Sequence, residues 1–305
     1  MSPENLRKLG EKPISVPLVP DDQGFIGREC SKESCKRYFK IKVIQKFDET
    51  NDNLVCAYCG YKGKSNSFFS EDQIKYAKSI VQKMAYEAIS KDLSNMYRPN
   101  DLIKLYISSP PPTINYYQEK QLETHIICSN CSNQYIVYGK FAFCPFCNSH
   151  NSYDILLNNL QLTIDMMSTI DSITSNKALL DRRLEDALGN IVATFDGFGR
   201  ELTKFKGKEV IFQNLTSAKK KILKRYKFDF TDVISQTDWK FMVVMFQKRH
   251  LIEHKLGVID AKYIGLTNGN QQDLGKNIKI SQTEIYQLIE LIRQISLRLK
   301  DGIKF

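Results

Sequence analysis

The sequence predicts a multidomain protein with small, cysteine-rich β elements and a helix in its N-terminal half and an all-α helical bundle in its C-terminal half. Two observations predict this fold class. All eight cysteines precede residue 148 of the 305, and the residues after about Asn151 carry long helical patterns with few strand patterns.

The first twenty residues lack the apolar segment of a signal peptide. No apolar run approaches the ~20 residues that a membrane-spanning helix needs. We therefore expect a cytoplasmic protein with no membrane partner, in a compartment where cysteines stay reduced.

The eight cysteines fall into four close pairs, and none is left over. In a reducing compartment, paired thiols at this spacing are typical of zinc sites. Two pairs supply four thiolates, which complete a closed tetrahedral site that is structural and not catalytic. We therefore expect about two structural zinc ions per chain and no catalytic metal. The predicted ligands are Cys30, Cys35, Cys56, Cys59, Cys128, Cys131, Cys144 and Cys147.

Both sets of cysteines resemble the zinc-ribbon superfamily, over residues ~25–65 and ~125–150. The second set has two Cys-x-x-Cys pairs that are separated by twelve residues, which is enough for a short hairpin. The first set has a wider leading pair, then a strand pattern over residues 37–47 and a turn over 48–53. Whether the four pairs combine in order or interleave stays open, as do a redox role and buried cysteines without a metal.

A helix is predicted to begin at Ser70, between the two sets. Its apolar residues recur at helical spacing, which predicts a face that packs against a core. These residues are Ile74, Ala77, Ile80, Val81, Met84, Ala88 and Ile89. Pro110–Pro112 predicts a stiff connector between this helix and the second ribbon.

Four amphipathic helices in succession predict a helical bundle after the second ribbon. Gly197 and Gly199 are expected to interrupt the second helix, Thr237 or Asp238 to cap the third, and Gly257 to end it. The predicted helices cover residues 154–175, 177–205, 238–256 and 281–300.

The third helix ends in the segment Arg249-His250-Leu251-Ile252-Glu253-His254, which holds two of the four histidines of the chain. At a helical turn of about 100° per residue, Glu253 lies about 40° from Arg249, His250 about 100° and His254 about 140°. One face of this helix thus begins apolar and becomes charged at its end. Because unpaired charge is costly to bury, these residues must be paired, hydrated or functional.

Three interpretations compete for this cluster. In the first, Arg249 and Glu253 form an ion pair one helical turn apart and the histidines are bonded locally. In the second, His250-x-x-Glu253-His254 matches a metalloprotease motif. Only 51 residues follow this motif, however, and they contain only two glutamates that could supply a third metal ligand. In the third, the cluster cleaves RNA without a metal: histidine transfers protons near neutral pH, and arginine stabilises a phosphate.

The spacing of Arg249 and His254 on a late helix of an all-α region resembles the Arg-x(4–6)-His motif of HEPN domains. The stretches FQKRHLIEHKLGVIDAKY and ALGNIVATFDGFGREL also look like parts of HEPN proteins. The resemblance covers about residues 155–300 and implies a HEPN-like helical bundle. In many members asparagine follows the arginine, whereas this chain has His250 at that position.

The resemblance implies a homodimer whose two motifs meet in one cleft. Arg249 would contact the scissile phosphate, His254 would transfer protons, and His250 would support them. The products would be a 2′,3′-cyclic phosphate and a 5′-hydroxyl. HEPN domains occur in toxin–antitoxin and antiphage systems, so the resemblance implies an antitoxin or a phage-derived regulator as a partner. Some members are inactive scaffolds.

The charge of the chain agrees with an RNA partner: 44 Lys and Arg against 34 Asp and Glu give a net charge of +10. Residues 219–227 hold the densest positive run. A solvated basic surface explains the net charge equally well, and basic runs of this kind are more often plain solvated surface.

These patterns divide the chain into a zinc ribbon with a following helix over residues 1–107, a second zinc ribbon over 108–152 and a HEPN-like helical domain over 153–305. We expect a metal-independent endoribonuclease, of a prokaryotic toxin or antiphage defence type, whose ribbons recognise a target or a trigger. The alternative is a non-enzymatic module in which the ribbons bind nucleic acid or protein and the helices dimerise.

Overall fold

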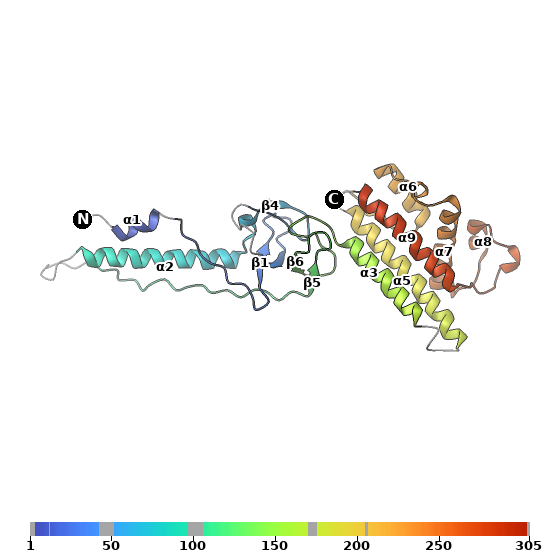
Figure 1. Cartoon of the computed structure of the whole chain (residues 1–305), viewed down its shortest axis with the longest axis horizontal. Coiled ribbons are helices and arrows are strands. Elements are labelled where there is room, and N and C mark those ends of the chain that lie inside the picture. The colour runs from blue at the N-terminus through green and yellow to red at the C-terminus, as the bar shows by residue number, and fades with distance from the viewer. Residues whose placement is uncertain are drawn as a thin grey trace. The chain divides into compact units, whose positions relative to one another are not determined.

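The computed structural model describes residues 4–11, 13–42, 52–96, 106–169, 176–204 and 207–303. The chain divides into two compact units, Met1–Ser149 and His150–Phe305 (Figure 1). The predicted domain boundary between residues 107 and 108 falls inside the first unit, and the predicted boundary between 152 and 153 lies close to the division. None of the helices in the described ranges is long and apolar enough to cross a membrane.

Four strands, two from each cysteine-rich region, form one antiparallel sheet in the first unit. Its order is β1-β2-β6-β5, and the pairs Lys40↔Ile136 and Ile41↔Tyr135 join the two regions. A separate ribbon pairs β3 with β4. The bounds are Phe25–Glu29 (β1), Tyr38–Lys42 (β2), Asn53–Val55 (β3), Lys62–Lys64 (β4), Thr124–Ile127 (β5) and Gln134–Val137 (β6). The two regions therefore pack as one body.

The core of this sheet is small and contains the cysteines themselves. Phe39, Leu54 and Phe68 are fully buried in it, the last from the short 3-10 helix Ser65–Phe68 (η1). The predicted strand over residues 37–47 is confirmed over β2, whereas its remainder and most of the predicted turn lie outside the described residues.

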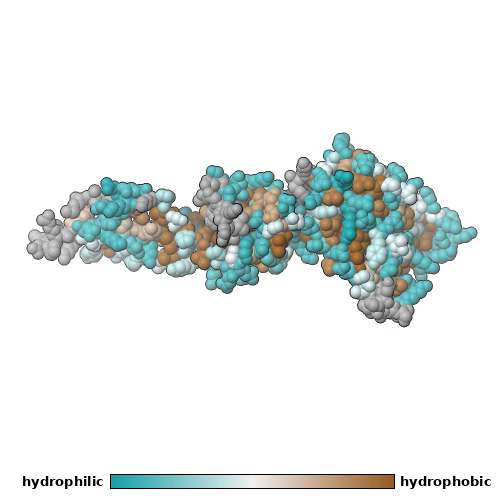
Figure 2. Space-filling model, viewed as in Figure 1, coloured by the Kyte–Doolittle hydropathy of each residue, from teal (hydrophilic) through white to brown (hydrophobic). Residues whose placement is uncertain are grey.

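Helix α2 (Glu71–Asn95) begins where the sequence predicts a helix, at a capping box formed by Ser70 and Gln73. The prediction that its apolar stripe faces a core is wrong, because Ile74, Met84 and Ile89 are 41%, 37% and 38% exposed. Figure 2 shows hydrophobic residues at the surface along this helix. Helical spacing identifies a face, but the fold decides what covers it.

The covered side of α2 is largely polar. Asp92 caps the short helix α1 (Glu4–Gly10) by accepting from the backbone N–H groups of Asn5 and Leu6, each at 2.9 Å. The segment after the predicted proline connector runs extended beside α2 (Figure 1), where Asn115 N–H donates to Ser79 Oγ at 3.0 Å.

The second unit is a helical bundle around one core, in agreement with the predicted all-α half. Its helices are α3 (Ser152–Ser168), α5 (Lys177–Lys204), α6 (Leu215–Tyr226), α7 (Gln236–Lys255), α8 (Ala261–Thr267) and α9 (Gln282–Gly302), with short 3-10 helices at Phe230–Asp232 (η2) and Gln271–Asp273 (η3). The sequence predicts α3, α5, α7 and α9 but not α6 or α8. Helix α6 carries the basic run, whose charges obscure the buried Leu215, Ala218 and Ile222.

Helix α5 continues without interruption through both glycines that were expected to break it. Gly199 has a packing role instead, because a Cβ there would lie 2.5 Å from the Phe212 ring. The buried Asp196 holds the same loop by accepting from the backbone N–H of Phe212 at 2.6 Å and of Gln213 at 3.2 Å. Gly199 therefore lets a loop approach the helix closely.

Candidate functional site

The first cysteine quartet joins the end of β1 to the end of β3. The Sγ atoms of Cys30 and Cys59 lie 3.7 Å apart and those of Cys35 and Cys56 3.8 Å apart, and all four lie within 4.8 Å of one another. A tetrahedral zinc ion with bonds of ~2.3 Å separates its sulfur ligands by roughly 3.8 Å. The quartet therefore has the size of a zinc site.

The second quartet repeats this arrangement after β5. The Sγ atoms of Cys128 and Cys147, and those of Cys131 and Cys144, are each 3.6 Å apart. The cysteine pairs thus combine in sequence order, which settles the pairing that the spacing left open.

All four cysteine pairs end in the same turn. The residue after each second cysteine has a left-handed backbone: the φ angles are 45° at Lys36, 69° at Gly60, 60° at Ser132 and 63° at Asn148. In the last three turns this residue donates its N–H to the carbonyl oxygen of the first cysteine of the pair, at 2.8–3.0 Å. Only Gly60 signals this turn in the sequence, since the other three positions hold residues that tolerate it at a cost.

The environment of the sulfurs explains why a cation suits them. Burial raises the pKa of the Cys30 thiol to about 12 and also raises the pKa of Cys56 and Cys144. Burial acts in the same direction on Cys147, but hydrogen bonds, of which that with Ser149 contributes most, lower its pKa to about 6. A bound zinc ion would supply the positive charge that keeps four buried thiolates ionised.

Helix α7 positions the Arg-His cluster. Its N-cap is Ser235, whose hydroxyl accepts from Asp238 N–H at 3.0 Å, so the helix begins before the predicted caps. It ends with Leu256 and Gly257 in the left-handed region, and Gly257 N–H donates to Leu251 carbonyl oxygen at 3.0 Å. This is the predicted glycine stop.

The buried Lys248 fixes the last turns of α7 to the start of α9. Its ammonium donates to the Lys279 carbonyl oxygen at 2.8 Å and to Glu284 Oε1 at 2.6 Å. Only 8% of Lys248 is exposed. Glu284 is one of the two glutamates that follow the cluster, and its carboxylate is engaged by Lys248.

Arg249, Glu253 and His254 form a connected group. The Arg249 guanidinium pairs with Glu253 Oε1, and Glu253 Oε2 lies 3.9 Å from His254 Nε2. The Arg249 side chain is only 14% exposed, whereas that of His254 is 57% exposed. The predicted local ion pair is therefore present, and Glu253 links the two residues of the motif.

The two histidines face each other at the end of the helix. Their ring centroids are 4.7 Å apart at an interplanar angle of 56°. Burial, followed by the nearby charges of His254, Lys262 and Arg249, lowers the pKa of His250. Both effects favour the neutral form of the imidazole.

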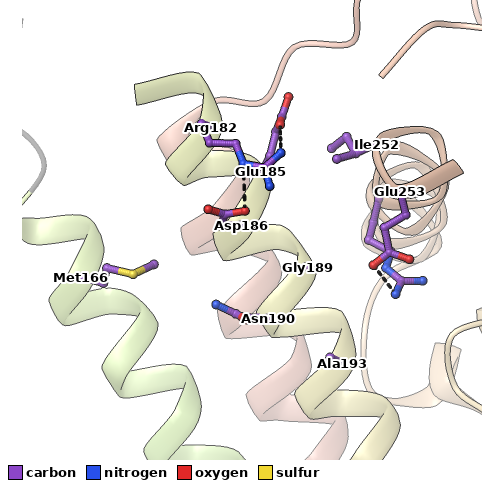
Figure 3. A pocket seen from close by; sticks show the side chains of 10 residues that line it. Met166, Arg182, Glu185, Asp186, Gly189, Asn190, Ala193, Ile252 and Glu253 are labelled. Atoms are coloured by element: carbon purple, nitrogen blue, oxygen red, sulfur yellow. Dashed lines mark ion pairs between the residues drawn. The ribbon is translucent and has the colours of Figure 1, made fainter. Parts of the chain in front are cut away.

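A cavity of about 690 Å³ lies between α5 and α7, with Met166 of α3 at its side (Figure 3). Arg249 and Glu253 contribute from α7, and Arg182 faces them from α5, where it pairs with Glu185 at 3.5 Å and Asp186 at 3.3 Å. The remaining lining residues are Gly189, Asn190, Ala193 and Ile252. Of the three predicted catalytic residues, only Arg249 lines the cavity; His250 and His254, on the same helix, do not.

The α5 residues of this cavity were not predicted as site residues. Arg182, Asp186 and Asn190 recur at a spacing of four residues, which places them on one helical face. A polar row of this kind is detectable in the sequence, but its partner across the cavity is not.

The residues of the metalloprotease-like motif, His250, Glu253 and His254, do not form a metal site in the described ranges. There, the two cysteine quartets alone bring three or more suitable ligand atoms of His, Cys, Asp or Glu together.

Comparisons with known proteins found no match for the chain among family models, curated proteins or solved structures. The resemblance to HEPN domains therefore stays a prediction that rests on the motif and its helical setting. Any activity must be argued from the residues themselves.

Proposed function

We propose that the helical unit is a metal-independent endoribonuclease in which Arg249 binds the scissile phosphate and His254 transfers protons. The observation that supports it most is the linked group of Arg249, Glu253 and His254 at the edge of a cavity of about 690 Å³. The partial exposure of Arg249 leaves its guanidinium within reach of a ligand in the cavity, and the fork of an arginine matches two phosphate oxygens.

The chemistry needs only groups that this chain and its substrate would supply. The RNA 2′-hydroxyl attacks the adjacent phosphorus while an imidazole removes its proton, and the bond from phosphorus to the 5′-oxygen breaks. A second imidazole returns a proton to that oxygen, which leaves a 2′,3′-cyclic phosphate and a 5′-hydroxyl. Arg249 would stabilise the extra negative charge of the phosphorane.

This scheme requires two proton-transfer groups around one phosphate. In one chain neither histidine lines the cavity. We propose that a second copy of the chain completes the site, with two motifs in one cleft. The exposed side chain of His254 is compatible with such a pairing.

The first unit, which holds both cysteine quartets, would then recognise the target RNA or a trigger. The net charge of +10 supports an RNA partner, because basic side chains gain affinity by neutralising phosphates. Lys219 of the basic run is held by Asp229 at 2.9 Å, whereas Lys220, Lys221 and Lys224 are exposed and could contact phosphates.

Labelled RNA with the full-length, zinc-loaded protein tests the proposal. We expect cleavage in the presence of EDTA, fragments with 2′,3′-cyclic phosphate ends, and a loss of about 10²-fold or more in Arg249→Ala and in His254→Ala. Arg298→Ala, which removes an exposed arginine of α9, is the matched control and should keep full activity. Full activity in both motif variants would overturn the proposal.

The Arg249–Glu253 ion pair itself favours one rival. A guanidinium already neutralised by a carboxylate could serve only to hold α7, in a protein that binds RNA or a protein without cutting it. Equal RNA binding by the wild type and both motif variants, with no cleavage by any of them, would favour this non-enzymatic module.

A further inference from the structure

A second cavity, of about 360 Å³, lies in the ribbon-containing unit. Three segments that are distant in the sequence form it: residues 19–22, Tyr76 of α2, and residues 116–119 and 121. The last of these belong to the segment that runs extended beside α2 (Figure 1). None of the cysteines lines it.

Three tyrosines form one wall of this cavity. The Tyr76 ring lies 6.2 Å from Tyr116, tilted by 38°, and 5.5 Å from Tyr117, nearly edge to face. Tyr116 is 80% exposed, so one of its faces is open to a ligand. Aromatic faces attract cations, especially where several rings converge.

The chain covers other aromatic rings of this unit with its own cations. Arg37 lies 3.7 Å from the Tyr58 ring centroid, and Lys42 lies 4.7 Å from that of Phe25. Within the described ranges, no lysine or arginine covers any of the three cavity tyrosines. These rings are therefore available to a cation from outside.

The charge of the residues that line the cavity also favours a cation. It contains three carboxylates and no basic residue, although the chain as a whole carries +10. Asp21 pairs with Lys40 at 2.8 Å, and Glu119 accepts from Gln73 and Tyr38. Asp22 has no ion pair or hydrogen bond with any residue that the structure describes.

We propose that this cavity binds a positively charged side chain of a protein partner, and arginine in preference to lysine. The planar guanidinium would stack on Tyr116 and pair with Asp22, while its apolar stem lies against Val19. The side-chain amide oxygens of Gln118 and Gln121 could accept its remaining N–H groups. RNA is a poor fit, because the three carboxylates repel its phosphates. This inference does not depend on the proposed ribonuclease.

The test uses ¹⁹F NMR of the full-length, zinc-loaded protein labelled with 3-fluorotyrosine, with the cavity resonances assigned by Tyr→Phe variants. The probe is N-acetyl-arginine methylamide, and N-acetyl-norleucine methylamide presents a similar stem without the charge. We expect the arginine probe, and not the norleucine probe, to shift the resonances of Tyr76, Tyr116 and Tyr117. Tyr116→Ala and Asp22→Asn should each weaken binding by about threefold or more, and added salt should weaken it further.

Tyr106→Ala and Glu123→Gln are matched controls, because both remove an exposed side chain of the same segment outside the cavity. They should leave binding within twofold. Equal shifts with the norleucine probe, or unchanged binding in Tyr116→Ala and Asp22→Asn, would overturn the proposal. So would an oligouridylate that shifts these tyrosines when the arginine probe does not.

Discussion

Glu253 forms an ion pair with the guanidinium of Arg249, one helical turn away, through its Oε1 atom. Its other carboxylate oxygen, Oε2, lies 3.9 Å from His254 Nε2. A phosphate that binds Arg249 must therefore compete with this carboxylate. The same carboxylate stands next to the imidazole that would transfer protons. Glu253 thus links the two functional groups and limits access to one of them.

Replacing Glu253 by Gln should tighten RNA binding. The change removes the competing negative charge but keeps the shape, so the dissociation constant for a fully 2′-O-methylated RNA, which lacks the nucleophile, should fall by about threefold. Fluorescence anisotropy measures it. Glu290→Gln removes an exposed carboxylate of α9 and should have little effect. Weaker binding in Glu253→Gln would show that the carboxylate supports Arg249 and does not compete with RNA.

The cysteine quartets predict a stepwise loss of zinc. Elemental analysis of the purified protein should find about two zinc ions per chain, and Cys59→Ser or Cys131→Ser should each reduce this to about one. Ser31→Ala, next to Cys30, should keep both ions. Zinc should also leave on acidification, because protons compete for the thiolates. A full zinc content in either cysteine variant would contradict the site.

His150 should make the stability of the helical unit depend on pH. Burial, with the charge of Lys204, lowers the pKa of His150 from 6.5 to about 3, while the nearby Glu201 is engaged by Lys204. Between these values the unfolded state binds a proton that the folded state does not. The free energy of unfolding should therefore fall as the pH drops below 6.5, by about 2 kcal/mol at pH 5.

Urea unfolding at pH 7 and pH 5 measures this effect. Its signal is the fluorescence of Trp239, the single tryptophan of the chain, which lies in the helical unit. His150→Asn should lose most of the pH dependence and keep an acceptor for Ser152 N–H, which donates to His150 Nδ1 at 3.2 Å. His125→Asn, in the other unit, should retain it. Equal slopes in wild type and His150→Asn would exclude His150 as the cause.

Gly199→Ala should destabilise the helical unit, although alanine normally favours a helix. The new Cβ would lie 2.5 Å from the Phe212 ring, which has to move inside a packed core, at a cost of about 2 kcal/mol. Gly189→Ala, on the same helix, meets no atom within 4 Å and should stabilise by about 0.5–1 kcal/mol. Thermal unfolding compares the two variants, and the same sign for both would contradict the packing argument.

The helices that the sequence predicts are those with a wide apolar face. Leu184, Leu188 and Phe195 of α5 recur at helical spacing and are all buried. Helix α6 escaped prediction because five of its twelve residues are Lys or Arg, counting Lys219, Lys220, Lys221, Lys224 and Arg225, and only three residues pack inward. Local pattern is informative where burial follows the helical period.

The cysteine quartets and the Arg-His motif could be identified from the sequence, because each is a pattern of particular residue types only a few positions apart. Tertiary structure alone decided which cysteine pairs share a quartet, that Ile74, Met84 and Ile89 of the apolar stripe of α2 lie exposed, and that Lys248 is buried against Glu284. It also set Arg182 and Asn190 across the cavity from Arg249. These outcomes depend on contacts between residues far apart in the chain, and spacing along a single segment carries no information about them.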